Sequence, residues 1–109
     1  MKNQILIGWT TTQSKEDALL LARGLVENSL AACVQVDGPL TSTYRWEGAI
    51  ETNKEWRLAV KFAADRAEEL EKWLLANHPY DEPQWLAVNA EKASSGYENW
   101  VFSETSPQE

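Results

Sequence analysis

The sequence feature that most constrains this chain is an extended stretch from Ala31 to Ala63, interrupted by one clear turn signal at Glu47-Gly48. After this turn the side chains alternate between the two faces of a strand, and from Trp56 onward every second one is apolar. The apolar positions are Trp56, Leu58, Val60 and Phe62. We therefore predict one long hairpin over residues 31–63, with strands about twice the usual length of 5 or 6 residues.

Short apolar runs and breaker residues predict the elements around this hairpin. Ser14 is expected to be the N-cap of a first helix, which Asn28-Ser29 ends. Pro39 cannot donate to a β-ladder, so Asp37-Gly38-Pro39 should form a turn, a bulge or an edge position. The other expected elements are a central strand at 5–9, a hairpin strand starting at Leu30, a helix from Asp65 that ends before Pro79, a strand at 84–90 and a C-terminal helix.

Apolar residues at helical spacing indicate which helix faces pack against the sheet. These residues are Ala18, Leu21, Ala22, Leu25 and Val26 in the first helix, Ala67, Leu70, Trp73 and Leu74 in the second, and Tyr97, Trp100 and Val101 in the third. The element order βαββαβ plus a helix is the ferredoxin-like pattern, an antiparallel sheet with helices on one face. The predicted fold class is α+β, as one domain over residues 1–109 with a polar tail at 103–109.

Composition limits the partners that this chain can have. Ten basic and 17 acidic residues give a net charge of −7, which repels phosphate backbones and anionic lipid. No apolar run reaches the roughly 18 residues that span a bilayer, Met1-Lys2-Asn3 opens no signal-peptide pattern, and the single Cys33 cannot form an internal disulfide. We therefore expect a cytoplasmic protein without nucleic-acid or membrane partners. Six tryptophans are many for so small a core, so some should face another subunit.

Several motifs occur in a fixed order along nearly the whole chain, from Ile5 to Val101. They are Leu30-Ala31-Ala32-Cys33, Tyr44-Arg45-Trp46-Glu47-Gly48, Glu55 with Lys61, His78-Pro79-Tyr80 followed by Pro83, and Tyr97 to Trp100. As a set they resemble the CutA family. The resemblance implies a homotrimer of ferredoxin-like protomers, similar in design to PII signalling proteins, with a role in divalent metal tolerance and with the copper binding of some family members.

The resemblance also implies where a metal would bind. The best-known copper site of the family uses a cysteine at the end of the first strand and a histidine before the His-Pro-Tyr motif, where this chain has Trp9 and Asn77. The remaining candidate ligands for Cu²⁺ or another divalent metal are Cys33 and His78, with Asp81 and Glu82 as oxygen ligands. The residues alone also allow roles without a metal. Cys33 can be a small buried hydrophobe, and His78 can be a structural or cleft-lining side chain.

Further residues are candidates for lining a cleft between subunits. Beside Cys33 and His78 they are Tyr44, Trp46, Glu55, Lys61, Tyr80, Tyr97 and Trp100. Tyr44 and Trp46 could instead serve subunit packing. Glu55 and Lys61 lie too far apart along one strand to touch, so each is expected to pair across strands or subunits.

No enzymatic activity is expected, because residues 10–14 lack the arginine of an acylphosphatase loop and no Ser/His/Asp or Cys/His signature is readable. Two functions stay open. One is a homotrimer that acts in divalent metal tolerance. The other is a PII-like regulatory or scaffold trimer whose clefts between subunits bind a small molecule or a protein. In both, the long hairpin is expected to build the trimer, since its exposed edges need a cover.

Overall fold

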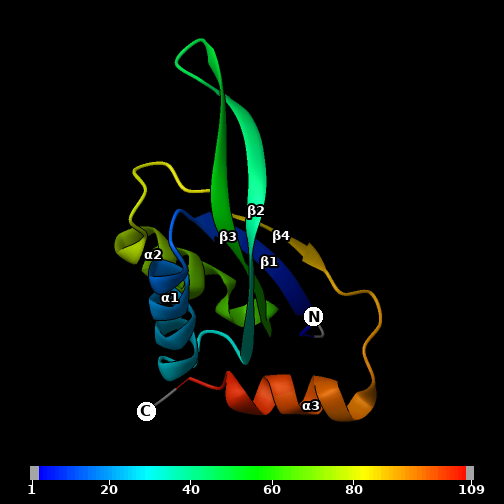
Figure 1. Cartoon of the computed structure of the whole chain (residues 1–109). Coiled ribbons are helices and arrows are strands. Elements are labelled where there is room, and N and C mark those ends of the chain that lie inside the picture. The colour runs from blue at the N-terminus through cyan, green and yellow to red at the C-terminus, as the bar shows by residue number, and fades with distance from the viewer. Residues whose placement is uncertain (1–2, 108–109) are drawn as a thin grey trace.

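The computed structural model describes residues 3–107, which form one antiparallel sheet with helices packed on it (Figure 1). The elements are β1 (Ile5–Thr12), α1 (Lys15–Glu27), β2 (Cys33–Trp46), β3 (Ala49–Ala63), a 3₁₀ turn (Ala64–Arg66), α2 (Ala67–Asn77), β4 (Leu86–Asn89) and α3 (Ser95–Glu104). The strand order is β2-β3-β1-β4, with every neighbouring pair antiparallel. The predicted α+β, ferredoxin-like fold and its central first strand are confirmed.

Helices α1 and α2 cover one face of the sheet and build the main core with it. Ser14 begins α1, because its Oγ accepts the backbone N–H of Asp17 at 3.1 Å, which confirms the predicted N-cap. The fully buried side chains of this core include Leu25, Leu58, Val60, Phe62, Leu70 and Leu74. Helix α3 packs at one end of the opposite face, where Val101 meets Ile5 and Ala32.

The hairpin of β2 and β3 reaches well beyond the rest of the molecule (Figure 1). Strand β1 pairs with β3 only from Trp56 to Ala63, so residues 49–55 of β3 pair with β2 alone. The turn residues Glu47 and Gly48 have positive φ angles of 47° and 82°, and glycine adopts such an angle without steric cost. The predicted hairpin and its turn are confirmed.

A β-bulge interrupts β2 between Asp37 and Leu40. Gly38 has a φ of 155°, and its open side lies against the Trp56 indole, where a Cβ atom would come within 2.6 Å of the ring. Among the three alternatives for Asp37-Gly38-Pro39, the structure therefore has a bulge, and the bulge lies on an edge strand.

Three predicted strands have different bounds in the structure. Strand β1 continues to Thr12 instead of ending at Trp9. Strand β2 begins at Cys33 instead of Leu30, because the chain turns tightly after α1 and the N–H groups of Leu30 and Ala31 both donate to the carbonyl of Leu25. Leu30 and Ala31 are buried in this turn as part of the core. The strand expected at 84–90 is reduced to the four residues of β4.

The start of α2 also differs from the prediction. The α-helix begins at Ala67 and not at Asp65, since the 3₁₀ turn over Ala64–Arg66 comes first. The buried Arg66 stabilises this turn by donating from Nε to the carbonyl of Ser29 at 3.2 Å. The predicted end before Pro79 is confirmed, because the helix stops at Asn77.

Some predicted apolar stripes pack only in part. Val26 of α1 is 44% exposed, and Tyr97 and Trp100 of α3 are 37% and 44% exposed, whereas Val101 is fully buried. The stripe drawn through Tyr97, Trp100 and Val101 is therefore wrong, and Val101 is the residue by which α3 is anchored.

The polar tail predicted from residue 103 begins later than expected. Helix α3 continues to Glu104, and the next residue, Thr105, is buried with its Oγ1 donating to the carbonyl of Val101 at 2.8 Å. The last tail residues, 108–109, and the N-terminal Met1 and Lys2 lie outside the described residues. No helix between residues 3 and 107 is long and apolar enough to cross a membrane.

Candidate functional site

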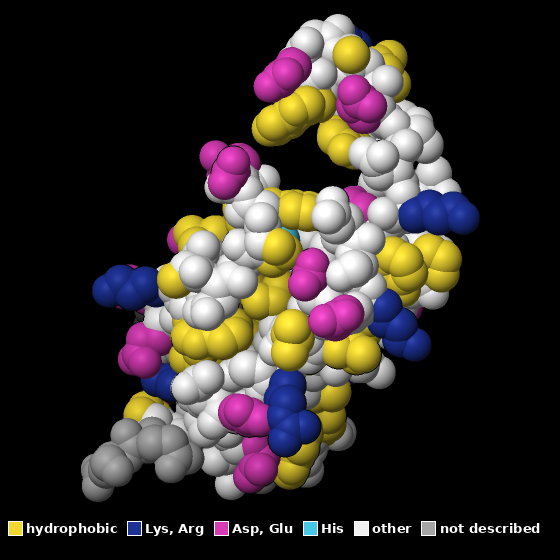
Figure 2. All heavy atoms as spheres, turned by 60° about the vertical axis from the view of Figure 1, so that its left-hand side comes forward, with side chains coloured by type: hydrophobic (Ala, Val, Ile, Leu, Met, Phe, Trp, Pro, Cys, Tyr) yellow, Lys and Arg dark blue, Asp and Glu magenta, His cyan; other side chains and the backbone are white. Residues whose placement is uncertain are grey.

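A cleft lies between the projecting hairpin and the loop that follows α2 (Figure 2). Its volume is about 770 Å³. It is lined by Thr11 of β1 and Gln13 just after it, by Ser42, Thr43, Tyr44, Trp46, Asn53, Lys54 and Glu55 of the hairpin, and by Tyr80, Asp81, Glu82 and Gln84 of the loop. We call this space the hairpin cleft. Figure 2 shows it as a hollow under the arching hairpin, with hydrophobic and acidic side chains on both sides.

His78 fixes the start of the loop that forms one wall of this cleft. As the C-cap of α2 it takes an extended conformation, with φ −73° and ψ 139°, which turns the chain away from the helix. Its Nδ1 accepts the backbone N–H of Tyr80 at 3.1 Å, so in the neutral ring the proton sits on Nε2. That Nε2 lies 3.0 Å from Thr10 Oγ1 on β1 and donates to it.

The environment of His78 favours the neutral imidazole. Burial lowers the pKa of His78 below its usual value near 6.5, although the carbonyl of Thr11 and the carboxylates of Asp17 and Glu55 partly oppose this shift. The side chain is only 8% exposed. In this arrangement both ring nitrogens are engaged within the protein, so His78 serves to hold the loop in place.

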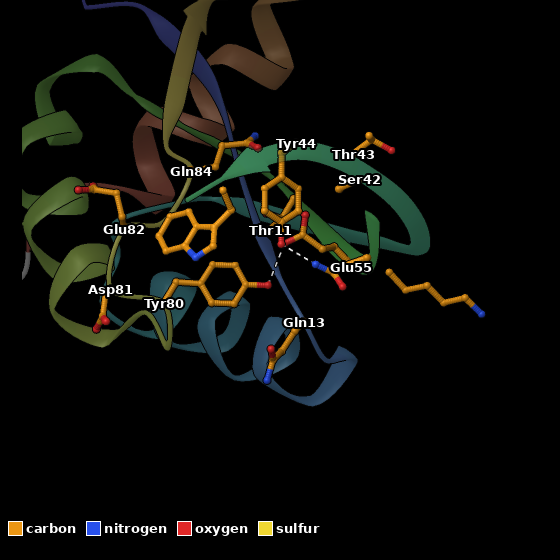
Figure 3. A pocket seen from close by; sticks show the side chains of 13 residues that line it. Thr11, Gln13, Ser42, Thr43, Tyr44, Glu55, Tyr80, Asp81, Glu82 and Gln84 are labelled. Carbon is orange, nitrogen blue, oxygen red and sulfur yellow. Dashed lines mark hydrogen bonds between the residues drawn. The ribbon is translucent and has the colours of Figure 1, made fainter. Parts of the chain in front are cut away.

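Tyr80 connects this loop to the base of the hairpin. Its hydroxyl donates to Glu55 Oε2 at 2.8 Å (Figure 3). Burial, followed by the hydrogen bond and the negative charge of Glu55, raises the pKa of the Tyr80 phenol far above its usual value near 10. The phenol is therefore a permanent hydrogen-bond donor, and it fixes the Glu55 carboxylate at the edge of the cleft.

Two aromatic side chains of the hairpin form the opposite wall. Tyr44 and Trp46 are 41% and 53% exposed, which is high for such large side chains. The Tyr44 hydroxyl accepts a hydrogen bond from the side-chain amide of Asn53 on the neighbouring strand. Figure 3 shows the rings of Tyr44 and Tyr80 on either side of the Glu55 carboxylate. The structure thus brings together four of the predicted cleft residues: Tyr44, Trp46, Glu55 and Tyr80.

Cys33 and Lys61 lie elsewhere, on the sheet face opposite to α1 and α2. They are direct partners in the pairing of β2 with β3, and Lys61 Nζ donates to Gln35 Oε1 at 2.7 Å. Lys61 therefore pairs across strands, which is one of the two possibilities expected from the sequence, the other being pairing across subunits. Its partner is Gln35. Cys33 is partly exposed on the same face.

Within one protomer Cys33 and His78 do not meet. Thr10, the partner of His78, pairs with Leu58 on the helix-covered face, whereas Cys33 pairs with Lys61 on the other face. Leu58 and Lys61 are three residues apart, so the two sites are also separated by about 10 Å along β3. Nowhere in residues 3–107 do three or more His, Cys, Asp or Glu side chains gather as a metal site would require. The residues of one protomer therefore do not fit a copper ion shared by Cys33 and His78.

Tyr97 and Trp100 lie outside the hairpin cleft, on α3, which packs at the other end of the sheet. Their ring centroids are 5.7 Å apart, so they contact each other instead of a cleft wall. The cleft residues that the sequence interpretation missed are polar: Thr11, Gln13, Ser42, Thr43, Asn53, Lys54 and Gln84. Turn and strand polar residues of this kind are common on any surface, so no local signal could have selected them.

The face of the sheet that carries Cys33 also has an exposed apolar surface. Leu86 and Val88 of β4 are 51% and 49% exposed, and their pairing partners Trp9 and Ile7 on β1 are partly exposed beside them. We call these four residues the open apolar face. Helix α3 covers only the end of the sheet next to it.

Comparison with known proteins gives consistent results over most of the chain. Residues 6–104 match the family described as "CutA1 divalent ion tolerance protein". The divalent-cation tolerance protein CutA of Thermus thermophilus is 35% identical over 105 residues, which cover 96% of this chain and 99% of that protein. Other relatives are longer: the chain spans only 55% of the chloroplastic CutA protein of Arabidopsis thaliana, at 31% identity over 92% of this chain.

Solved structures agree with the sequence comparison. The crystal structure of divalent ion tolerance protein CutA1 from Ehrlichia chaffeensis superposes with a TM-score of 0.91 at 31% identity. The match covers 97% of this chain and 99% of the other. The likeness therefore includes the hairpin as well as the body.

Proposed function

This chain belongs to the CutA1 divalent ion tolerance family, and from that premise we propose that it supports tolerance to divalent metal ions as a cytoplasmic homotrimer, without catalysis. The observation that carries the proposal is the open apolar face of Ile7, Trp9, Leu86 and Val88. Contiguous apolar surface of this kind usually marks a contact with another protein. Burying each large apolar side chain would contribute about 1.5–3 kcal/mol.

The hairpin supports the same proposal. Beyond Trp56 it has an unpaired backbone edge on each side, and near its tip it carries Tyr44, Trp46 and Ile50, of which Ile50 is 68% exposed. Exposed edges with apolar side chains lead to aggregation unless another chain covers them. A closed ring of identical protomers covers every edge equally. The number three is what the family resemblance implies.

Copper chemistry does not enter the proposal through a shared site of Cys33 and His78. These side chains lie on opposite faces of the sheet, and both nitrogens of His78 already have partners. A thiolate or an imidazole standing alone is a weak copper site, since such sites combine several nitrogen and sulfur ligands. Copper binding by this chain therefore stays a prediction of the family resemblance alone.

A growth assay tests the proposed function. The chain is expressed in a bacterial strain that lacks its own family member and grows poorly at raised divalent metal concentration. The wild type should restore growth, whereas Val88→Glu should not, because it places a charge in the open apolar face. Leu20→Glu, a matched change at a 63% exposed position on α1, should restore growth like the wild type. Failure of the wild type, or full rescue by Val88→Glu, would contradict the proposal.

A second candidate function is that of a PII-like regulator that binds a small molecule or a protein. The hairpin cleft favours it, because about 770 Å³ is within the usual size range of ligand pockets and its walls combine aromatic rings with a fixed carboxylate. Both functions are compatible with the same trimer.

A further inference from the structure

The hairpin leaves the body of the sheet at one narrow place. Strand β1 pairs with β3 only up to Trp56, and the bulge of β2 between Asp37 and Leu40 lies opposite this residue, so that Leu40 pairs with Glu55. Support from β1 therefore ends at the level where the pairing with β2 is irregular. Beyond it, residues 40–55 form an arm that no other strand of the described chain supports (Figure 1). Because a bulge bends the strand that contains it, the base of this arm is where its angle is set.

One side-chain hydrogen bond joins this arm to the rest of the molecule. Tyr80, in the loop after α2, donates from its hydroxyl to Glu55 Oε2 at 2.8 Å, at the base of the arm (Figure 3). The other side-chain hydrogen bonds of residues 40–55 stay within the arm. Among residues 3–107, the bond from Tyr80 to Glu55 is therefore the only side-chain hydrogen bond or ion pair that holds the arm from outside.

The donor of this bond is itself held in place by the sheet. His78 Nδ1 accepts the backbone N–H of Tyr80 at 3.1 Å, and His78 Nε2 donates to Thr10 Oγ1 on β1 at 3.0 Å. The rings of His78 and Tyr80 also contact each other, with their centroids 5.0 Å apart. A continuous chain of contacts thus runs from the central strand through His78 and Tyr80 to the base of the arm.

We propose that Tyr80 is a positioning residue for assembly, whose hydrogen bond to Glu55 holds the hairpin at the one angle at which identical protomers close into a ring. A contact repeated between identical chains closes only when each step turns by the same fixed angle, and otherwise it continues as an open assembly. The inference rests on the proposed trimer for this consequence, although the hairpin angle is a property of one chain.

The length of the arm makes the assembly sensitive to this angle. The part of β2 beyond the bulge, from Leu40 to Trp46, is about 20 Å long, so a rotation of about 15° at its base moves the tip by about 5 Å. A displacement of that size is larger than the distance over which packed side chains stay in contact. The tip would then miss its place on the next protomer.

Pulsed electron-spin distance measurements test the angle directly. Spin labels are attached at Glu16→Cys on α1 and at Glu51→Cys near the hairpin tip, two exposed positions, in a full-length chain that also carries Cys33→Ser. The labelled chain is refolded with an excess of unlabelled chain, so that one assembly holds at most one labelled copy. This background should give one narrow distance distribution.

Tyr80→Phe keeps the ring and removes only the hydroxyl. Loss of a hydrogen bond to a carboxylate lowers the preference for one orientation by about tenfold, so the distance distribution should broaden or shift by about 5 Å. Glu55→Ala removes the acceptor and should have the same effect, and the double variant should change the distribution no further. An unchanged distribution in Tyr80→Phe, or additive effects of the two substitutions, would overturn the proposal.

A matched control separates this bond from a general loosening of the fold. Tyr97→Phe removes a hydroxyl from a tyrosine on α3, away from the hairpin, and should leave the distribution as it is. If Tyr97→Phe broadens it as much as Tyr80→Phe does, the assigned role of Tyr80 is wrong.

Light scattering measures the consequence for assembly. At low micromolar concentration Tyr80→Phe should give a mixture of particle sizes, where the wild type gives a single trimer. A uniform trimer of Tyr80→Phe with an altered hairpin angle would refute the link to ring closure. A monomeric wild type would instead contradict the proposed function, and the distance measurement would still decide whether Tyr80 sets the angle.

Discussion

His78 shows how one buried side chain can organise a loop. It accepts the N–H of Tyr80 with Nδ1 and donates to Thr10 with Nε2, which ties the loop after α2 to β1. The bond to Thr10 was not predictable from the sequence, because Thr10 and His78 are 68 residues apart. The sequence did place His78 in a motif before Pro79, and Pro79 does end the helix. Local rules thus predicted the end of the helix, whereas the contact of the ring with Thr10 depends on tertiary packing.

His78 also gives the protein a pH-dependent stability. Its pKa is lowered in the folded state by burial, so the folded state binds less proton than the unfolded state, whose pKa is near 6.5. The stabilisation is therefore fully present above pH 6.5 and is lost as pH falls through 6.5 toward the lower folded pKa. Urea unfolding at fixed protein concentration between pH 5 and pH 8 should show this loss.

The variant His78→Gln provides the control for the pH experiment. A glutamine can donate and accept hydrogen bonds like a neutral imidazole but does not titrate. The free energy of unfolding of the variant should therefore fall less below pH 6.5 than that of the wild type. Parallel pH profiles of the two proteins would show that His78 is not the group responsible.

At the scale of elements, the alternation of apolar and polar residues was enough to predict the hairpin. Its turn at Glu47-Gly48 and its buried side from Leu58 to Phe62 are as expected. The start of β2 was not predicted correctly, since an apolar run such as Leu30 to Ala32 looks the same in a strand and in a buried turn. The difference lies in the hydrogen bonds of Leu30 and Ala31 to Leu25, which no sequence pattern displays.

The bulge in β2 requires a glycine at position 38. Gly38→Ala would place a methyl group within 2.6 Å of the Trp56 indole at a φ of 155°, so we expect a loss of about 1–3 kcal/mol in the free energy of unfolding. Gly96→Ala is the matched control, because its Cβ meets no atom within 4 Å and it lies in α3. That change should be neutral or stabilise by up to about 1 kcal/mol. Equal effects of the two substitutions in chemical unfolding would contradict this account of the bulge.

At the scale of the whole molecule, the tryptophans agree with the argument from composition. One chain was expected not to hide six indoles, and none of the six is fully buried: Trp9, Trp56, Trp73 and Trp85 are partly exposed. Two of them lie over glycines, Trp73 over Gly24 and Trp85 over Gly8, and these contacts make room for large rings in a small core. Trp46 and Trp100 are the most exposed, at 53% and 44%. The open apolar face of Ile7, Trp9, Leu86 and Val88 was not anticipated, because it is formed by strands whose order only the fold reveals.

The central claim is that this face and the hairpin are covered by further copies of the chain. Size-exclusion chromatography with multi-angle light scattering at low micromolar concentration measures it directly. A particle of three times 12.4 kDa is expected for the wild type and for Leu20→Glu, and a smaller one for Val88→Glu. A wild-type chain that is folded and elutes as a 12.4 kDa monomer would contradict the account.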